Sequence, residues 1–188
     1  GQINQVGFSL YLEMLDSAVA ALQRGEIPDL DQPLDSGTDI KLHVPALIPE
    51  QYLPDISTRL VLYKRIAKAG SEEALREIQV EMIDRFGLLP EPTKNLFTCA
   101  LLRTSAQRLG IGEIDMTEEG GSIEFKPATV VEPASIVTLI QSDPQRYRLG
   151  GNNKLRVTAE LPTLESRTEL IETLLDPWLA ALPQEASG

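Results

Sequence analysis

The spacing of apolar residues along this chain changes at Gly110, and that change limits the folds open to it. Before Gly110, apolar residues recur every three or four positions, which is typical of amphipathic helices. After it, short segments alternate between apolar and polar residues, which is typical of strands with one buried face. Helices followed by hairpins favour an α+β fold over alternating α/β. We expect a helical cluster packed on a small, mainly antiparallel sheet built from hairpins, with a C-terminal helix.

Composition divides the chain into four segments. An amphipathic pattern ends at Gly25, and residues 25–38 are rich in Pro, Asp and Gly, which is linker composition. Residues 1–24 are therefore predicted to be the trailing helix of a preceding domain, as if the sequence were excised from a longer protein. Residues 39–183 are predicted to form the C-terminal domain, and residues 184–188 a tail.

The first half of this domain is predicted to be one strand and three helices. The strand pattern covers residues 40–49, and Pro45 places it at an edge or ends it. The helices are expected over residues 55–69, 71–86 and 93–109. In the first helix, we expect four residues to face inward: Ile56, Leu60, Tyr63 and Ala67. The second helix has Ser71 as N-cap, Leu75, Ile78, Met82 and Phe86 on its inner face, and Gly87 at its end.

The second half is predicted to contain two hairpins and two helices. "EIDMTEE" and "SIEFKP" flank a turn at Gly120 and Gly121. A short helix runs from Pro133 to Asp143, and "YRL" and "KLRVTAEL" form the second hairpin around "GGNN". The last helix, residues 163–182, is interrupted by Pro177. It is expected to bury Leu164, Leu170, Leu174, Leu175 and Trp178.

The charge of the chain limits its partners. Its 28 acidic and 17 basic residues give a net charge of −11, which repels phosphate backbones and anionic lipids. We therefore expect no direct binding to nucleic acid or to a membrane, and docking to a basic surface instead. Cys99 is the single cysteine, which excludes an internal disulfide and suits a reducing cytoplasm.

Residues able to carry chemistry are few. His43 is the single histidine, so Cys/His catalysis would require it to meet Cys99, and both residues have the sequence context of structural residues. Metal sites need clusters of ligands, which one His and one Cys do not supply. The chain contains no phosphate-binding glycine motif in a strand-to-helix context. We expect no catalytic residue, no metal and no cofactor.

The segment "SEEALREIQVEMIDRFGLLPEP" places like charges on the outer side of its helix. Glu73, Glu77, Glu81 and Asp84 point away from the inner face, and each like-charge pair four residues apart costs roughly 0.2–0.5 kcal/mol. Three interpretations remain open: a solvated surface, a docking surface for a basic partner, and a catalytic carboxylate pair. The catalytic pair would be Glu81 with Asp84, or Glu118 with Glu119, and it would require a cleft and a raised pKa.

Six segments resemble a known family. They match, in order, the end of a translocase motor and then the C-terminal domain of bacterial transcription-repair coupling factors: "GFSLYLEMLDSAVAAL", "VPALIPEQYLPDISTRLVLYKRIAKA", "EIQVEMIDRFGLLPEP", "LLRTSAQRLGIGEI", "GGSIEF" and "PQRYRL". The resemblance implies a regulatory, autoinhibitory domain of a large ATP-driven translocase that acts on stalled RNA polymerase. It implies docking on a UvrB-like N-terminal domain of the parent, which masks the UvrA-binding surface until polymerase is engaged.

The family's contact helix matches "VEMIDRFG", which implies interaction residues at Glu81, Asp84 and Arg85. Helix geometry adds Glu77 and Val80 to this surface. Two alternatives to a regulatory domain are a domain that only stabilises the end of the motor and a small carboxylate-dependent enzyme.

Overall fold

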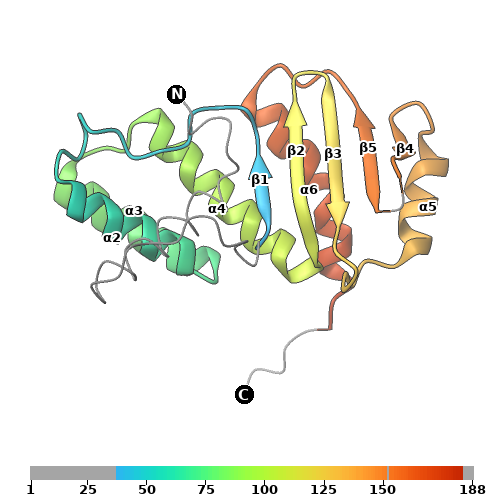
Figure 1. Cartoon of the computed structure of the whole chain (residues 1–188), viewed down its shortest axis with the longest axis horizontal. Coiled ribbons are helices and arrows are strands. Elements are labelled where there is room, and N and C mark those ends of the chain that lie inside the picture. The colour runs from blue at the N-terminus through green and yellow to red at the C-terminus, as the bar shows by residue number, and fades with distance from the viewer. Residues whose placement is uncertain (1–36, 152, 184–188) are drawn as a thin grey trace, which may run out of the picture. The chain divides into compact units, whose positions relative to one another are not determined.

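The computed structural model describes residues 37–151 and 153–183 (Figure 1). The chain divides at residue 104 into two compact units, the N-terminal unit and the C-terminal unit. The predicted trailing helix of residues 1–24, the tail of residues 184–188 and nearly all of the linker lie outside the described residues. The described elements confirm the predicted α+β class.

The N-terminal unit consists mainly of helices. It contains β1 (Asp39–Lys41), α2 (Ile56–Lys68), α3 (Glu72–Phe86) and α4 (Glu91–Leu109) as far as Thr104. Each of α2 and α3 begins at a residue whose side chain accepts a hydrogen bond from the first turn: Asp55 from Thr58 N, and Ser71 from Ala74 N. Their buried residues form the core with α4: Leu62, Tyr63, Ile66, Leu75, Ile78, Met82, Leu96, Phe97, Cys99, Ala100 and Leu102.

The strand expected over residues 40–49 is much shorter than predicted. β1 ends at Lys41, and the chain then turns through His43, whose φ is +58°. Tertiary partners satisfy the following main chain: Tyr63 Oη accepts from Ile48 N at 2.7 Å, and Thr93 Oγ1 donates to Leu47 O at 3.0 Å. The alternating residues therefore belong to an irregular segment and not to a strand. Its main-chain groups form hydrogen bonds with side chains of the helical region instead of with a neighbouring strand.

The buried face of α2 also differs from the prediction. Ile56 is exposed, and Leu60 and Ala67 are only half-buried, whereas Tyr63 is buried as expected. Leu62 and Ile66 complete the buried stripe. The helix carries apolar residues around much of its circumference, so its periodicity alone allowed more than one inward face.

The C-terminal unit is built around antiparallel strands. It contains β2 (Ile111–Thr117), β3 (Gly120–Phe125), α5 (Pro133–Ser142), β4 (Tyr147–Leu149), β5 (Lys154–Thr158) and α6 (Leu164–Ala180). These four strands lie in the order β2-β3-β5-β4, each antiparallel to its neighbour. In Figure 1, α6 lies behind β2 and β3, and α5 lies beside β4. Trp178 of α6 meets Phe125 of β3 edge to face, with ring centroids 5.7 Å apart.

The first hairpin turns two residues earlier than predicted. Glu118 and Glu119 form the turn, and Gly120 pairs with Thr117 as the first residue of β3. A Cβ at Gly120 would collide with the Val157 carbonyl of β5, and a Cβ at Gly121 would collide with the Asp115 carbonyl of β2. The two glycines therefore allow close approach of neighbouring strands rather than forming the turn themselves.

The last helix is close to its prediction. Leu170, Leu174, Leu175 and Trp178 are buried as expected, whereas Leu164 is half-buried. Pro177 lies inside α6, which continues to Ala180.

Candidate functional site

The outer side of α3 presents the acidic residues that the sequence singled out. Leu75, Ile78 and Met82 are buried on the inner side, as predicted, whereas Phe86 is only half-buried. The opposite side therefore exposes Glu77 and Asp84 to solvent, and Val80 between them is 53% exposed. An open hollow runs along this side and is lined by Glu73, Arg76, Glu77, Val80, Glu81, Asp84 and Arg85. We call Glu77, Val80, Asp84 and Arg85 the α3 surface.

Tyr52 holds the end of α3 that carries Asp84. Its hydroxyl donates to Gly87 O at 2.8 Å and lies 3.2 Å from Met82 O, so it satisfies carbonyls at the helix end. Its ring packs edge to face on Phe86, with centroids 6.2 Å apart. Gly87 ends the helix at φ +96°. The α3 surface is thus carried by a helix fixed at both ends, by Ser71 and by Tyr52.

Glu81 lies at the edge between α2 and α3. Its side chain is 38% exposed and accepts from two arginines: Arg65 of α2, whose Nη2 lies 3.2 Å from Oε1, and Arg85, whose Nη1 lies 3.3 Å from Oε2. The hydrogen bond from Arg65 is the main cause that lowers the pKa of the Glu81 carboxyl below its ordinary value. Arg85 also lies over the Phe86 ring, 4.7 Å from its centroid.

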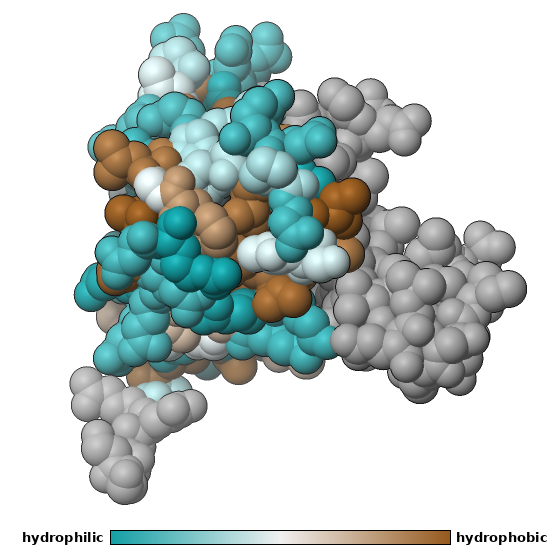
Figure 2. Space-filling model, turned by 90° about the vertical axis from the view of Figure 1, so that its left-hand side faces the viewer, coloured by the Kyte–Doolittle hydropathy of each residue, from teal (hydrophilic) through white to brown (hydrophobic). Residues whose placement is uncertain are grey.

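The five predicted interaction residues therefore have different surroundings. Glu77 and Asp84 make no ion pair within the part of the chain that the structure describes, whereas Glu81 is neutralised by Arg65 and Arg85. Arg65 was not identified from the sequence as the partner of Glu81. The two residues lie on different helices, so their spacing in the sequence does not indicate the ion pair. Figure 2, which views the molecule from the α2 and α3 side, shows hydrophilic surface surrounding smaller hydrophobic areas.

The Arg65–Glu81 ion pair predicts a specific pH dependence. Since the folded pKa of Glu81 is lowered, the pair stabilises the fold above the ordinary pKa of a glutamate. That contribution disappears as the pH falls through the lowered folded pKa. Thermal unfolding of wild type and of Glu81→Gln should therefore give a Tm difference at about pH 7 that shrinks below about pH 4. Glu77→Gln on the same helix is the control, because the Glu77 side chain makes no ion pair with the residues that the structure describes. A difference for Glu81→Gln that stays constant with pH would contradict this role.

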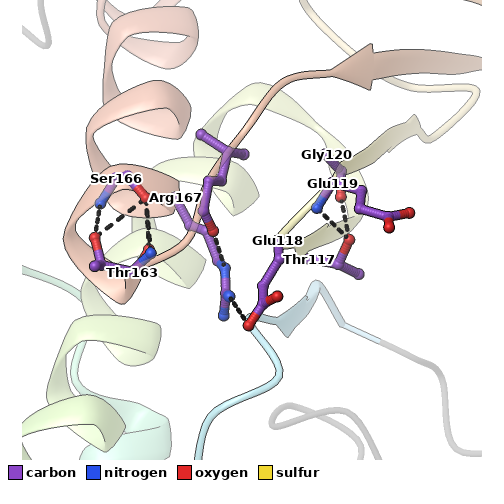
Figure 3. Close-up of polar contacts among 8 residues, drawn as sticks. Thr117, Glu118, Glu119, Gly120, Thr163, Ser166 and Arg167 are labelled. Carbon is purple, nitrogen blue, oxygen red and sulfur yellow. Dashed lines mark hydrogen bonds and ion pairs between the residues drawn. The ribbon is translucent and has the colours of Figure 1, made fainter.

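The alternative carboxylate pair, Glu118 and Glu119, has structural contacts. The main-chain carbonyl of Glu118 accepts a hydrogen bond from Leu161 N, and that of Glu119 accepts one from Ala159 N. These bonds connect the turn to the segment before α6. The Glu118 side chain is 77% exposed and lies 3.9 Å from Nη2 of the buried Arg167 (Figure 3). Arg167 in turn donates from Nε to Leu161 O at 3.0 Å.

Figure 3 also shows how α6 begins beside this turn. Thr163 Oγ1 accepts from Ser166 N, and Ser166 Oγ accepts from Thr163 N, both at 3.1 Å. These contacts fix the hairpin turn and the helix start together. Through their main-chain carbonyls, Glu118 and Glu119 thus have a structural role in joining the hairpin turn to the segment before α6.

Other chemistry finds little support in the described residues. Burial raises the pKa of the Cys99 thiol to about 12, so Cys99 stays protonated and is not a nucleophile near neutral pH. His43 is exposed on its loop. Within residues 37–151 and 153–183, no group of three or more His, Cys, Asp or Glu side chains could hold a metal ion. Among the helices described, none has both the length and the apolar character needed to cross a bilayer.

Comparison with known proteins identifies similar chains. A family model described as the TRCF domain matches residues 42–136. The transcription-repair-coupling factor of Escherichia coli (strain K12) is 43% identical over 175 residues, which are 93% of this chain and 15% of that protein. The Haemophilus influenzae protein of the same name is 45% identical over the same shares of the two chains. The Myxococcus xanthus protein is 30% identical over 98% of this chain.

A solved structure shares the fold. The crystal structure of the C-terminal domain of a transcription-repair coupling factor superposes with a TM-score of 0.60 and 18% identity, covering 80% of this chain and 100% of that one. The chain spans 15% of the length of the E. coli and H. influenzae relatives.

Proposed function

Because the chain belongs to the TRCF domain family, we propose that it is a non-catalytic regulatory domain of a transcription-repair coupling factor in the bacterial cytoplasm. In this proposal it docks on a UvrB-like N-terminal domain of its parent protein. Docking covers the surface that would bind UvrA and restrains the parent's translocase. Engagement of stalled RNA polymerase releases the domain, which itself contacts no nucleic acid.

One observation supports this proposal above the others: unpaired carboxylates flank an exposed apolar residue on one rigid helix face. Glu77 and Asp84 make no ion pair within the described residues, and Val80 lies between them. Repulsion between like charges lowers the stability of a helix slightly when no partner is bound. Arginines on a partner would remove that repulsion, and charge pairs of this kind set the register and specificity of docking.

The surroundings of Glu81 give it a different role from its neighbours. Its carboxylate already bonds Arg65 and Arg85, so we assign it a positioning role. It fixes α3 against α2 and holds the Arg85 guanidinium in its place within the α3 surface. Contact with the partner is then assigned to the α3 surface itself, with Asp84 and Glu77 as acceptors, Val80 as the apolar contact and Arg85 as a donor.

A modest preference for the docked state is enough for regulation. A coupling of about 1–3 kcal/mol changes a partner's affinity by roughly 5- to 150-fold. Exposed charge pairs suit this role because each contributes little and salt weakens it. Polymerase binding would then release the domain if it favours the undocked state by a similar amount.

Charge reversal tests the proposal in the full-length parent. Glu77→Lys combined with Asp84→Lys should raise UvrA affinity by about tenfold and increase ATPase activity, because the docked state loses its charge pairs. The matched control is Glu165→Lys with Glu172→Lys, which makes the same charge change at exposed positions of α6. If the double reversal folds normally and both activities remain at wild-type levels, α3 is not the docking surface.

A domain that only stabilises the motor's end predicts the opposite result on truncation. Removing the parent's residues that correspond to 39–183 should increase UvrA binding and ATPase activity if the domain restrains them. Loss of ATPase activity would favour the stabilising role instead. Direct titration of this chain against the N-terminal domain should also show affinity that falls as salt rises.

A further inference from the structure

The helix α5 of the C-terminal unit is unusual because it is apolar and yet buries none of its residues completely. Its sequence, PASIVTLIQS, carries no charge, and Val137 is 48% exposed. On β4, Leu149 is 62% exposed. Soluble proteins seldom expose contiguous apolar surface without a use for it, and such surface is typical of interaction sites.

This apolar surface surrounds a pocket. The pocket has a volume of about 400 Å³ and lies between α5 and the ends of the strands. Phe125 and Val131 form buried parts of its wall, whereas Val137 and Leu149 are at its exposed side. Its size and its mainly apolar lining are those of a site that takes an aliphatic or aromatic group.

The charged residues of the pocket have one sign. Its lining includes Lys126 and Lys154 and no acidic residue, although the chain as a whole has a net charge of −11. Lys154 lies 3.8 Å from Glu124, which does not line the pocket. Lys126 makes no ion pair within the part of the chain described here. A basic rim around an apolar floor selects an occupant that combines an apolar side chain with acidic neighbours.

We infer that this pocket binds a short acidic segment of a partner protein, with one apolar anchor residue inserted between α5 and β4 and its carboxylates beside Lys126 and Lys154. Val130, next in the chain to Val131 of the pocket wall, is 54% exposed and offers a further apolar contact, which favours a peptide over a small carboxylic acid. The site lies in the C-terminal unit and is separate from the α3 surface, so it adds a second interaction of opposite charge.

The test uses the acidic peptide DEDLFDED, which offers a leucine and a phenylalanine as alternative anchors, titrated into the isotope-labelled 188-residue chain and followed by NMR. Chemical-shift changes should be concentrated at residues that line the pocket. Lys126→Glu with Lys154→Glu should weaken binding by about tenfold or more, since each removes an attraction and adds a repulsion. Leu149→Asp should do the same, and its exposed position makes loss of fold a minor concern.

The controls separate this site from general attraction to positive charge. Arg148→Glu makes the same charge change as each single lysine substitution and lies beside Leu149. Successive strand residues point to opposite faces, so its effect on binding should be less than about twofold. The peptides DEDSSDED and KKKLFKKK should bind at least about tenfold more weakly. Absence of localised shifts, equal binding of DEDSSDED, or binding unaffected by the lysine substitutions in a folded protein would each overturn the proposal. If laurate, a fatty acid, causes localised shifts at the pocket residues and the peptide DEDLFDED does not, the pocket belongs to a small-molecule ligand and the proposal is overturned.

Discussion

Replacing Gly120 with alanine is expected to lower the free energy of unfolding by roughly 3–6 kcal/mol, which is a large part of the stability of an ordinary domain. Two costs add. Gly120 has a φ of +110°, where an alanine is strained, and its Cβ would meet the Val157 carbonyl of β5. The obstructing atoms belong to the main chain of a paired strand, so relief requires breaking the β3–β5 ladder.

Two other glycines provide matched controls for this prediction. Gly151→Ala introduces strain alone, because φ is +77° but no atom lies within 4 Å of the added Cβ, and it should cost about 1 kcal/mol. Gly70→Ala meets neither obstacle and should leave stability unchanged or slightly raised. Chemical denaturation of the three variants measures the difference. If Gly120→Ala is as mild as Gly151→Ala, the close approach of β3 and β5 is wrong.

Replacing Met82 with alanine should cost about 2–5 kcal/mol, because its side chain is fully buried on the inner side of α3 and the substitution leaves a cavity. This loss would loosen the helix that carries the α3 surface. Docking in the parent should therefore weaken together with stability. Urea unfolding of the isolated chain and UvrA binding by the parent are the two measurements.

Val80→Ala provides the matched comparison, two residues away on the same helix. Its side chain is exposed, so stability should change by less than about 0.5 kcal/mol. If Val80 contacts the partner, UvrA binding in the parent should still increase, and the two variants then separate folding from docking. Equal stability of Met82→Ala and Val80→Ala would be incompatible with the burial of this face.

Local chemistry made much of the fold predictable. Ser71 caps α3 as predicted, and the second hairpin lies on either side of its glycine turn. Within α3, the ion pairs Arg76–Glu72 and Arg85–Glu81 each join residues four positions apart. These features depend on residues within a few positions of one another, so the sequence contains the physical cause directly.

The wrong predictions share a different cause. The turn of the first hairpin depended on how closely β5 approaches Gly120, and the sequence of the hairpin carries no information on that neighbouring strand. The irregular segment after Lys41 alternates like a strand because buried and exposed residues alternate along it. The hydrogen bonds of Leu47 and Ile48 go to the start of α4 and to Tyr63 instead of a ladder partner.

The candidate site divides in the same way. Helix periodicity by itself placed Glu77, Val80 and Asp84 outward, because a helix with one buried stripe must expose the opposite side. Only the tertiary structure decided that Glu81 is committed to Arg65, since that pairing depends on how α2 packs against α3. The sequence thus determined which charges face solvent, and the packing of helices determined which of those charges remain unpaired, because pairing is a matter of distance between segments that the order of residues does not contain.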